Sequence, residues 1–241
     1  MRLAVISDIH GNLEAFKAVI SRLKRERYDK IVFLGDVVGY GADPNECCKL
    51  LRKLTNIVVL GNHDAAVLNP ELDQYFNMYA RSAIEWTRRH LSRENREWLS
   101  EFPIKVKMDD LLIVHAAPYK PEEWEYVIST YDAMFQFKHF GDKFCLFGHS
   151  HVPGAFELRD DRVEFIYKDV IELRKDARYM LNPGSIGQPR DHDPRASFAI
   201  LDTDEMIFKI IRVEYDVEKA SKKIINAGLP KFLADRLFDG I

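Results

Sequence analysis

Four short polar clusters carry residue types that bind metal ions. They are Asp8-Ile9-His10, Gly35-Asp36, Gly61-Asn62-His63-Asp64 and Gly148-His149-Ser150-His151. Together with His115 they offer carboxylate oxygens, an amide oxygen and imidazole nitrogens. That mixture suits Mn, Fe, Co or Zn better than Mg or Ca. The residues therefore predict a dinuclear transition-metal site.

The predicted site has the parts needed to hydrolyse a phosphoester. A carboxylate such as Asp36 can bridge two ions, and ions about 3.5 to 4 Å apart can hold a phosphoryl group and lower the pKa of a bridging water toward about 7. That water would be the nucleophile. His63 adjoins the expected ligand Asn62 and can protonate the leaving oxygen without being a ligand itself. Asp64 is expected to orient His63.

Each cluster also has an ordinary structural explanation. An isolated Asp-x-His is usually surface or capping chemistry, and Gly-Asn-His-Asp makes a good turn. His149 and His151 could be buried structural histidines. The combination favours metal binding, because five of the eight histidines fall at expected strand ends beside Gly, Asp or Asn. His90 and His139 are expected on helix surfaces.

Short apolar runs precede the metal-binding residues and predict buried strands. In open sheets with parallel strands, ligands bind beyond the carboxyl ends of the strands, so residues distant in sequence can converge there. The runs span Leu3 to Ile6, Ile31 to Leu34, Ile57 to Leu60, Leu111 to Val114 and Phe144 to Phe147.

The remaining pattern predicts an α/β fold, a four-layer α/β/β/α sandwich of two mixed sheets flanked by helices. Helices are expected after Asn12, from Asp43-Pro44, over Tyr79 to Leu91, and from Ser92 through Leu99. Further strands are expected at Ile104 to Met108, Gly154 to Leu158, Val163 to Tyr167, Arg178 to Leu181, Phe198 to Asp202 and Met206 to Val213. We expect one domain over residues 1–241, with a lid at 116–142 and a C-terminal helical appendage at 215–241.

Composition argues against several classes of function. The 241-residue chain has a formal charge of -3, which gives no electrostatic case for nucleic-acid binding. No apolar stretch is long enough to span a bilayer, and the first strand begins without a signal-peptide pattern, so we expect a cytoplasmic protein. Cys47, Cys48 and Cys145 suggest buried thiols rather than a disulfide framework or a zinc site.

The clusters, taken in order, resemble the pattern of the calcineurin-like metallophosphoesterase superfamily. That pattern is Asp-x-His, Gly-Asp, Gly-Asn-His-Asp/Glu, a single His and Gly-His-x-His, and it is present here across residues 8–151. Segments 35–41 and 182–190 resemble the bacterial and archaeal branch labelled diadenosine tetraphosphatase-like. The resemblance implies the sandwich fold, and it implies His63 as the leaving-group acid. It implies one metal held by Asp8, His10, Asp36 and His151, and the other by Asp36, Asn62, His115 and His149.

Two departures from the family pattern bear on the substrate. Phosphoprotein phosphatases and typical symmetrical dinucleoside tetraphosphate hydrolases carry Asp-Arg-Gly after the bridging Gly-Asp, whereas this chain has Gly39-Tyr40-Gly41. Ala116 follows His115 where glycine is common. We expect Arg190 to replace the missing arginine as a phosphate clamp, with Tyr40 and His192 as the next candidates. A Gly/Pro turn between strands is an equally good interpretation of segment 182–190.

The expected function is a phosphoesterase with two divalent ions, manganese first, with iron, zinc, cobalt or nickel as alternatives. Metal-bound hydroxide would attack a small phosphodiester or nucleotide directly, without a covalent intermediate. The alternatives are a phosphomonoesterase or phosphoprotein phosphatase, and a protein-binding scaffold without turnover. A nuclease is disfavoured because a basic stripe is missing. The sequence leaves the oligomeric state open.

Overall fold

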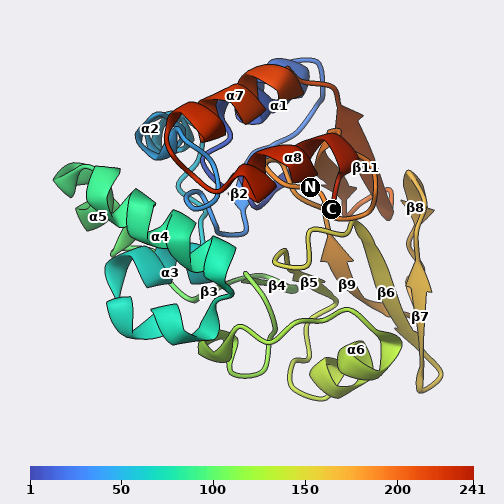
Figure 1. Cartoon of the computed structure of the whole chain (residues 1–241). Helices are drawn as coiled ribbons and strands as arrows, with labels where there is room; N and C mark the ends of the chain where they lie inside the picture. Colours follow the sequence, from blue (N-terminus) through green and yellow to red (C-terminus); the bar gives the residue numbers. More distant parts are fainter.

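The computed structural model describes residues 1–241 as two β-sheets packed face to face between helices (Figure 1). The first sheet has the strand order β2 (Lys30–Phe33), β1 (Arg2–Ile6), β10 (Ala196–Asp202), β11 (Ile207–Val213) and β8 (Val170–Glu172). The second has the order β3 (Lys105–Met108), β4 (Leu111–Val114), β5 (Phe144–Leu146), β9 (Arg178–Asn182), β6 (Gly154–Arg159) and β7 (Arg162–Ile166). The predicted four-layer sandwich is confirmed.

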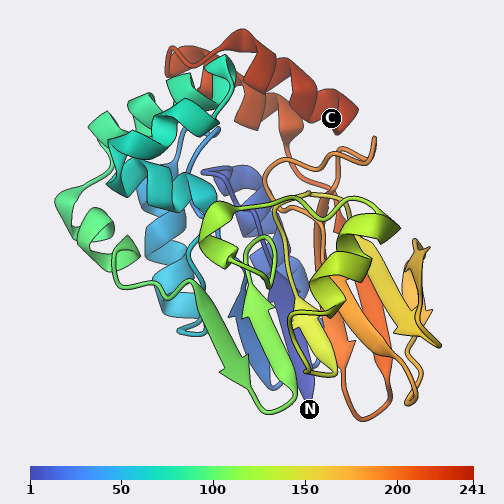
Figure 2. The same cartoon turned by 90° about the horizontal axis from the view of Figure 1, so that it is seen from below.

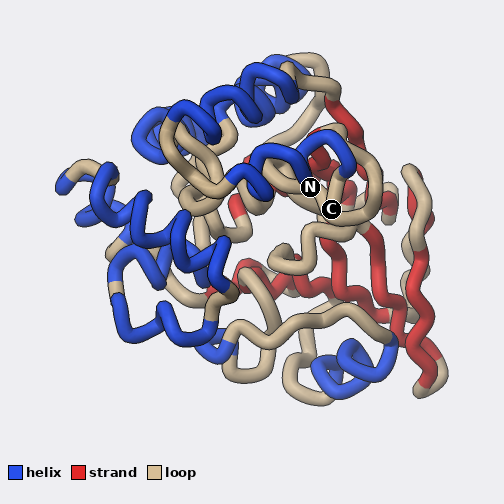
Figure 3. Tube along the Cα trace, viewed as in Figure 1, coloured by secondary structure: helices blue, strands red, loops and turns tan.

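The helices cover the outer faces and one end of the sheets (Figure 3). They are α1 (Leu13–Leu23), α2 (Pro44–Leu54), α3 (Asn62–Leu68), α4 (Met78–His90), α5 (Arg93–Leu99), α6 (Thr130–Phe137), α7 (Val217–Asn226) and α8 (Lys231–Asp239), with 3-10 turns η1 (Pro70–Tyr75) and η2 (Pro121–Glu123). None of these helices is long and apolar enough to cross a bilayer.

Alternation along the strands explains why their sequences are apolar throughout. In β1, Leu3 and Val5 face the core between the two sheets, whereas Ala4 and Ile6 face the core beneath α1 and α2. Successive side chains of a strand point to opposite faces, and here both faces are covered. The outer face of the second sheet is closed in the same way by α6, with Phe137 in the third core.

Both sheets contain parallel pairs, at one edge of the first sheet and at the centre of the second. Strand β1 pairs with β2, and β5 pairs with both β4 and β9, all in parallel. Their carboxyl ends therefore point to one edge of the sandwich, which is the edge that the polar clusters follow. The strand expected at Ile57 to Leu60 is reduced to a single parallel bridge between Phe33 and Val58, so that prediction was largely wrong.

Two regions flank this edge. Segment 116–142 crosses it with η2 and then forms α6. At the other side, α7 and α8 pack against α4 (Figure 2), where Leu233 and Leu237 of α8 share a core with Ala80, Ala83 and Tyr40. The C-terminal helices thus pack against Tyr40 of the Gly39-Tyr40-Gly41 turn.

Candidate metal centre

The strand ends bring all seven expected ligands into one buried cluster. Asp8 and His10 follow β1, Asp36 follows β2, His115 follows β4, and His149 and His151 follow β5. Asn62 opens α3, a helix that sequence reasoning missed. Each of these side chains is at most 8% exposed. So many buried polar groups in one place need partners, because an unpaired buried charge is costly.

The backbone of the cluster is unusual. Non-glycine residues rarely adopt a positive φ, and such positions gather at functional sites. Here five of the expected ligands have φ between 49° and 63°: Asp8, His10, Asp36, His149 and His151. Gly35 (φ 98°) is required for a second reason, because a Cβ there would lie 2.8 Å from Nδ1 of His115.

Two groups of ligand atoms can be distinguished. In the first, Nε2 of His151 lies 3.2 Å from Oδ1 of Asp8 and 3.1 Å from Nε2 of His10. In the second, Nε2 of His115 lies 3.3 Å from Oδ2 of Asp36, and His149 completes the group. In each group the ligand atoms all lie within 4.8 Å of one another.

Asp36 touches both groups. Its Oδ2 lies 3.3 Å from Nε2 of His115 and 3.7 Å from Nε2 of His10, and it is buried without a hydrogen-bond partner. Asn62 adds an amide oxygen 3.1 Å from Nε2 of His115. The arrangement has the form of two ligand sets that share one carboxylate.

The histidine rings are oriented by the main chain. Nδ1 of His10, His115 and His151 lies 3.1, 2.7 and 2.5 Å from the carbonyl oxygens of Val38, Leu34 and Gln188, respectively. If Nδ1 carries the proton and donates a hydrogen bond to the carbonyl oxygen, Nε2 keeps a lone pair that faces the centre. Metal-binding histidines require such a lone pair.

A cation fits this donor set. With Nδ1 protonated in both rings, the Nε2 lone pairs of His10 and His151 face each other at 3.1 Å. They repel each other unless a metal ion or a proton lies between them. Oδ1 of Asp8, Oδ2 of Asp36 and Nε2 of His149 are buried without hydrogen-bond partners. An ion bound in each group would give these atoms a partner.

Electrostatics support the same reading. Burial disfavours a charged imidazole, yet Asp36 raises the pKa of His115 to about 9. Burial likewise opposes ionisation of Asp36, but His115 and His63 hold the pKa of that carboxyl well below its usual range. Burial lowers the pKa of His151 to about 3. The ionised carboxylates therefore favour a positive charge at the centre. Protonated His115 would carry that charge in the absence of a metal, and a divalent ion would take the place of its Nε2 proton.

His63 adjoins the centre without belonging to either of the two sets. Its ring lies 4.8 Å from that of His10 and is held between Tyr40 at 4.4 Å and Phe76 at 5.0 Å. A ligand atom of His63 also falls within 4.8 Å of those of His10 and Asp36. Its Nδ1 is buried without a hydrogen-bond partner. The ring can thus reach a group held at the centre.

The expectation that Asp64 orients His63 was wrong. The Asp64 carboxylate accepts hydrogen bonds from the backbone N–H groups of Asp36 at 2.8 Å, Val38 at 3.1 Å and Gly61 at 3.3 Å. It turns away from the His63 ring because these donors lie on the loop after β2 and at the start of α3. Asp64 therefore anchors the backbone that carries Asp36.

Arg190 lies beside the centre, on the loop after β9. Its Nη2 donates to Tyr40 Oη at 3.2 Å and to Gln188 Oε1 at 3.1 Å, and its Nε is buried without a partner. No carboxylate forms an ion pair with it. Tyr40, which replaces the family's arginine, thus contacts Arg190 directly. His192 is exposed, and His90 and His139 are also exposed, away from the centre.

Sequence reasoning did not single out two aromatic residues of segment 116–142. The Tyr126 ring stacks on His149 at 3.9 Å, and the Trp124 ring stands edge-on to His115 at 5.9 Å. The only available signal was the aromatic content of this segment, which does not indicate where each ring points.

The two-sheet sandwich and its buried Asp/His cluster can now be compared with known families. Residues 1–206 match the model of the calcineurin-like phosphoesterase superfamily domain, so the chain belongs to this superfamily, as its motifs predicted. Members of the family are metal-dependent hydrolases of phosphoesters.

The chain is also similar to three individual proteins. It is 43% identical to the uncharacterized protein MJ0912 of Methanocaldococcus jannaschii, over 99% of this chain and 98% of that protein. It is 25% identical to the phosphodiesterase YfcE of Escherichia coli, over 85% and 89% of the two chains. The crystal structure of a metallophosphoesterase from Sphaerobacter thermophilus superposes with a TM-score of 0.87 at 39% identity, covering 100% of this chain and 99% of that one.

Proposed function

We propose that the protein hydrolyses small phosphodiesters or nucleotides with two divalent transition-metal ions, manganese first among them. The observation that carries the proposal is the shared carboxylate, since Oδ2 of Asp36 faces His10 on one side and His115 on the other. One set would be Asp8, His10, Asp36 and His151, and the other Asp36, Asn62, His115 and His149.

The bound ions would polarise the phosphoryl group and lower the pKa of a water molecule, which supplies the nucleophile. The protein's own groups do the rest. Arg190 and Tyr40 are positioned to hold a phosphate oxygen, because the guanidinium has no carboxylate partner and its Nε is unsatisfied. Bidentate contacts from arginine to phosphate are strong and directional.

His63 would protonate the leaving oxygen. Its ring reaches the centre between Tyr40 and Phe76, and no side chain holds its Nδ1. A general acid must lie within hydrogen-bond reach of the oxygen that leaves. The same ring also lines a cavity of about 640 Å³ that opens on the centre, so the departing group would lie in that cavity.

Support for a diester comes from similarity to the phosphodiesterase YfcE. The absence of the phosphate-binding arginine after Asp36 weighs against a phosphoprotein phosphatase. A non-catalytic scaffold is disfavoured because none of the seven ligand residues is missing. The family's monoesterases remain the second candidate.

A reconstituted screen tests the proposal. Protein loaded with manganese is assayed with p-nitrophenyl phosphate, bis(p-nitrophenyl) phosphate and diadenosine tetraphosphate, and metal content is measured in parallel. We expect two ions per chain and fastest turnover of the diester. Preference for the monoester would support the second candidate, and two bound ions without turnover of any substrate would support a scaffold.

A further inference from the structure

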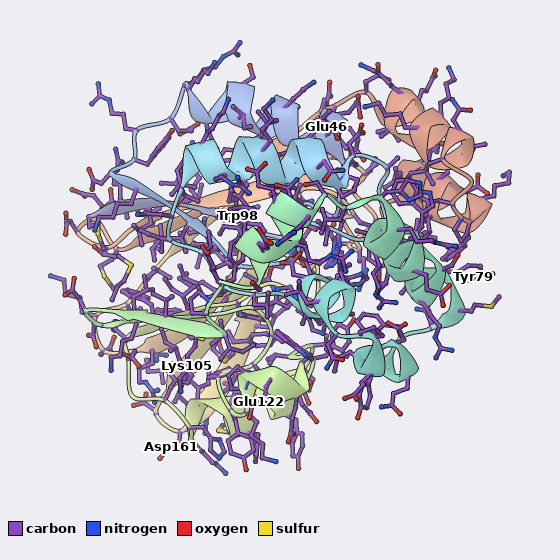
Figure 4. The ribbon with its side chains drawn as sticks, turned by 90° about the vertical axis from the view of Figure 1, so that its left-hand side faces the viewer. Glu46, Tyr79, Trp98, Lys105, Glu122 and Asp161 are labelled. Atoms are coloured by element: carbon purple, nitrogen blue, oxygen red, sulfur yellow. The ribbon has the colours of Figure 1, made fainter.

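A cavity of about 640 Å³ opens directly on the candidate metal centre. Its floor is formed by Asn62, His63 and His149, and its two sides come from η1 with α4 and from residues 122–126. Figure 4 labels Glu122 on the light green segment that carries residues 122–126 and Tyr79 on helix α4. Cavities of roughly 300 to 1,000 Å³ are typical of small-molecule sites.

The walls of this cavity are aromatic. Tyr75 and Phe76 line one side, Trp124 and Tyr126 line the other, and Tyr40 lies at the base. Tyr75 is 77% exposed, which leaves its ring free to contact a ligand. Flat rings on opposite sides of a cavity suit a planar group that stacks on them.

The position of Trp124 is enforced by the backbone. Both Lys120 and Trp124, at the two ends of η2, have a positive φ, of 46° and 56°. A bulky residue in this region is strained, and such strain persists where the surrounding structure over-determines it, often at ligand-binding positions. Here the strained residue places an indole ring next to His115 and on the cavity wall.

The rim of the cavity is acidic. Glu122, Glu123 and Glu125 line it, and no lysine or arginine does. Glu123 pairs with Lys120 at 2.6 Å, but Glu122 and Glu125 form no ion pair. A phosphate placed beside these carboxylates would be repelled, so the cavity is built for a group without negative charge.

We propose that this cavity binds the leaving group of the substrate and that the leaving group is an uncharged nucleoside. The aromatic walls match a nucleobase, and the acidic rim excludes a second phosphate. A small quaternary ammonium group would also be attracted by rings and carboxylates, but it would leave most of 640 Å³ unfilled. The assignment as leaving-group pocket rests on the proposed phosphodiesterase activity; nucleoside binding does not.

Adenosine binding to the manganese-loaded full chain tests the pocket without turnover. Calorimetry should detect adenosine, and Trp124→Ala should weaken its binding by about 5- to 150-fold, the range for losing one base–aromatic stack. Tyr75→Ala, on the opposite wall, provides a second variant at an exposed site. Tyr131→Ala is the matched control, because Tyr131 is 84% exposed on α6 and does not line the cavity, and it should bind adenosine like the unmodified chain.

The acidic rim is tested by comparing AMP with ADP. With its terminal phosphate at the centre, ADP must place a second phosphate in the pocket, so AMP should bind more tightly. Glu122→Gln combined with Glu125→Gln should reduce this preference by roughly 2- to 30-fold, the range for two exposed charge interactions. Glu164→Gln, on β7, should leave the preference unchanged.

The outcomes separate this inference from the proposed function. Adenosine binding that depends on Trp124 and Tyr75, without phosphodiester turnover, would uphold the pocket and reject the activity. Diester turnover with adenosine binding absent, or unchanged in both aromatic variants, would reject the nucleoside pocket alone. Tighter binding of tetramethylammonium than of adenosine would also overturn it, in favour of a cation site.

Discussion

Replacing Asp64 with asparagine should destabilise the protein and loosen the metal centre. The carboxylate accepts backbone hydrogen bonds of 2.8 Å from Asp36 and 3.1 Å from Val38, with longer ones from Gly61 and Val37. Hydrogen bonds to a charged group contribute about 1.5 to 3 kcal/mol each, and this applies above pH 7, because burial and the neighbouring Asp36 raise the pKa of Asp64 to about 7. Asparagine keeps one acceptor oxygen but turns an NH₂ group toward backbone donors. We therefore expect the free energy of unfolding to fall by about 2 to 4 kcal/mol.

Thermal unfolding and metal analysis check this prediction together. For a chain of this length each kcal/mol corresponds to about 2 to 4 °C, so Tm should fall by roughly 4 to 16 °C. Manganese affinity should fall as well, because the backbone of Asp36 is released.

The matched control is Asp132→Asn. Asp132 also accepts N–H groups, from Ser129 at 2.9 Å and Ile128 at 3.2 Å, but on an exposed helix cap. Removing a helix cap lowers the free energy of unfolding by about 0.5 to 2 kcal/mol, and we expect a value near the lower end of this range, with unchanged metal binding. If Asp64→Asn instead kept its stability and its metals and only shifted the pH profile of turnover, Asp64 would act through His63 and the anchoring role would be refuted.

Three further predictions address the centre. Asp36→Asn should lose both metal occupancy and activity, measured by elemental analysis and turnover. Cys145→Ser, in a core away from the centre, should keep both. Equal losses in the two variants would contradict the shared ligand. His63→Ala should retain its metals and lose about 10²- to 10⁴-fold in kcat, with a smaller loss for aryl leaving groups; a loss that is the same for all leaving groups would exclude the general acid. Arg190→Ala should lower kcat/KM with Tm and metal content unchanged, and Arg190→Lys should recover only part, because lysine lacks the planar fork; full kcat/KM in the alanine variant would make the loop a structural turn.

The layered fold and the convergence of the ligands could be predicted because they depend on local patterns. Short apolar runs predicted strands buried on both faces, and polar residues directly after them predicted a common edge. The buried positions confirm the runs in β1, β2, β4 and β5. Segment 57–60 has the same apolar pattern, but Leu60 bonds to Pro103 and only Val58 bridges to Phe33, so a strand does not form.

The role of Asp64 could not be predicted because it depends on three-dimensional packing. In sequence it follows His63, which suggested a pair. In the structure Asn62 begins a helix, and Asp64 lies in its first turn, where a carboxylate turns back toward free N–H groups. The loop after β2 passes the same point and adds donors from Asp36 and Val38. No pattern in the sequence indicates that this loop and this helix meet.

The aromatic pocket could not be predicted from the sequence for a different reason. An exposed tyrosine such as Tyr75 has no signature in sequence, and Trp124 reaches His115 only because its backbone takes a left-handed conformation that its residue type disfavours. The same conformation recurs at Asp8, His10, Asp36, His149 and His151, where side chains must turn from strand ends to a common point. Of the 13 non-glycine residues with a positive φ, these six and Tyr40 lie at the centre or on the cavity wall. A relaxed backbone at these positions would point the donor atoms apart. The packed strands behind these buried residues are what hold the backbone in the left-handed conformation.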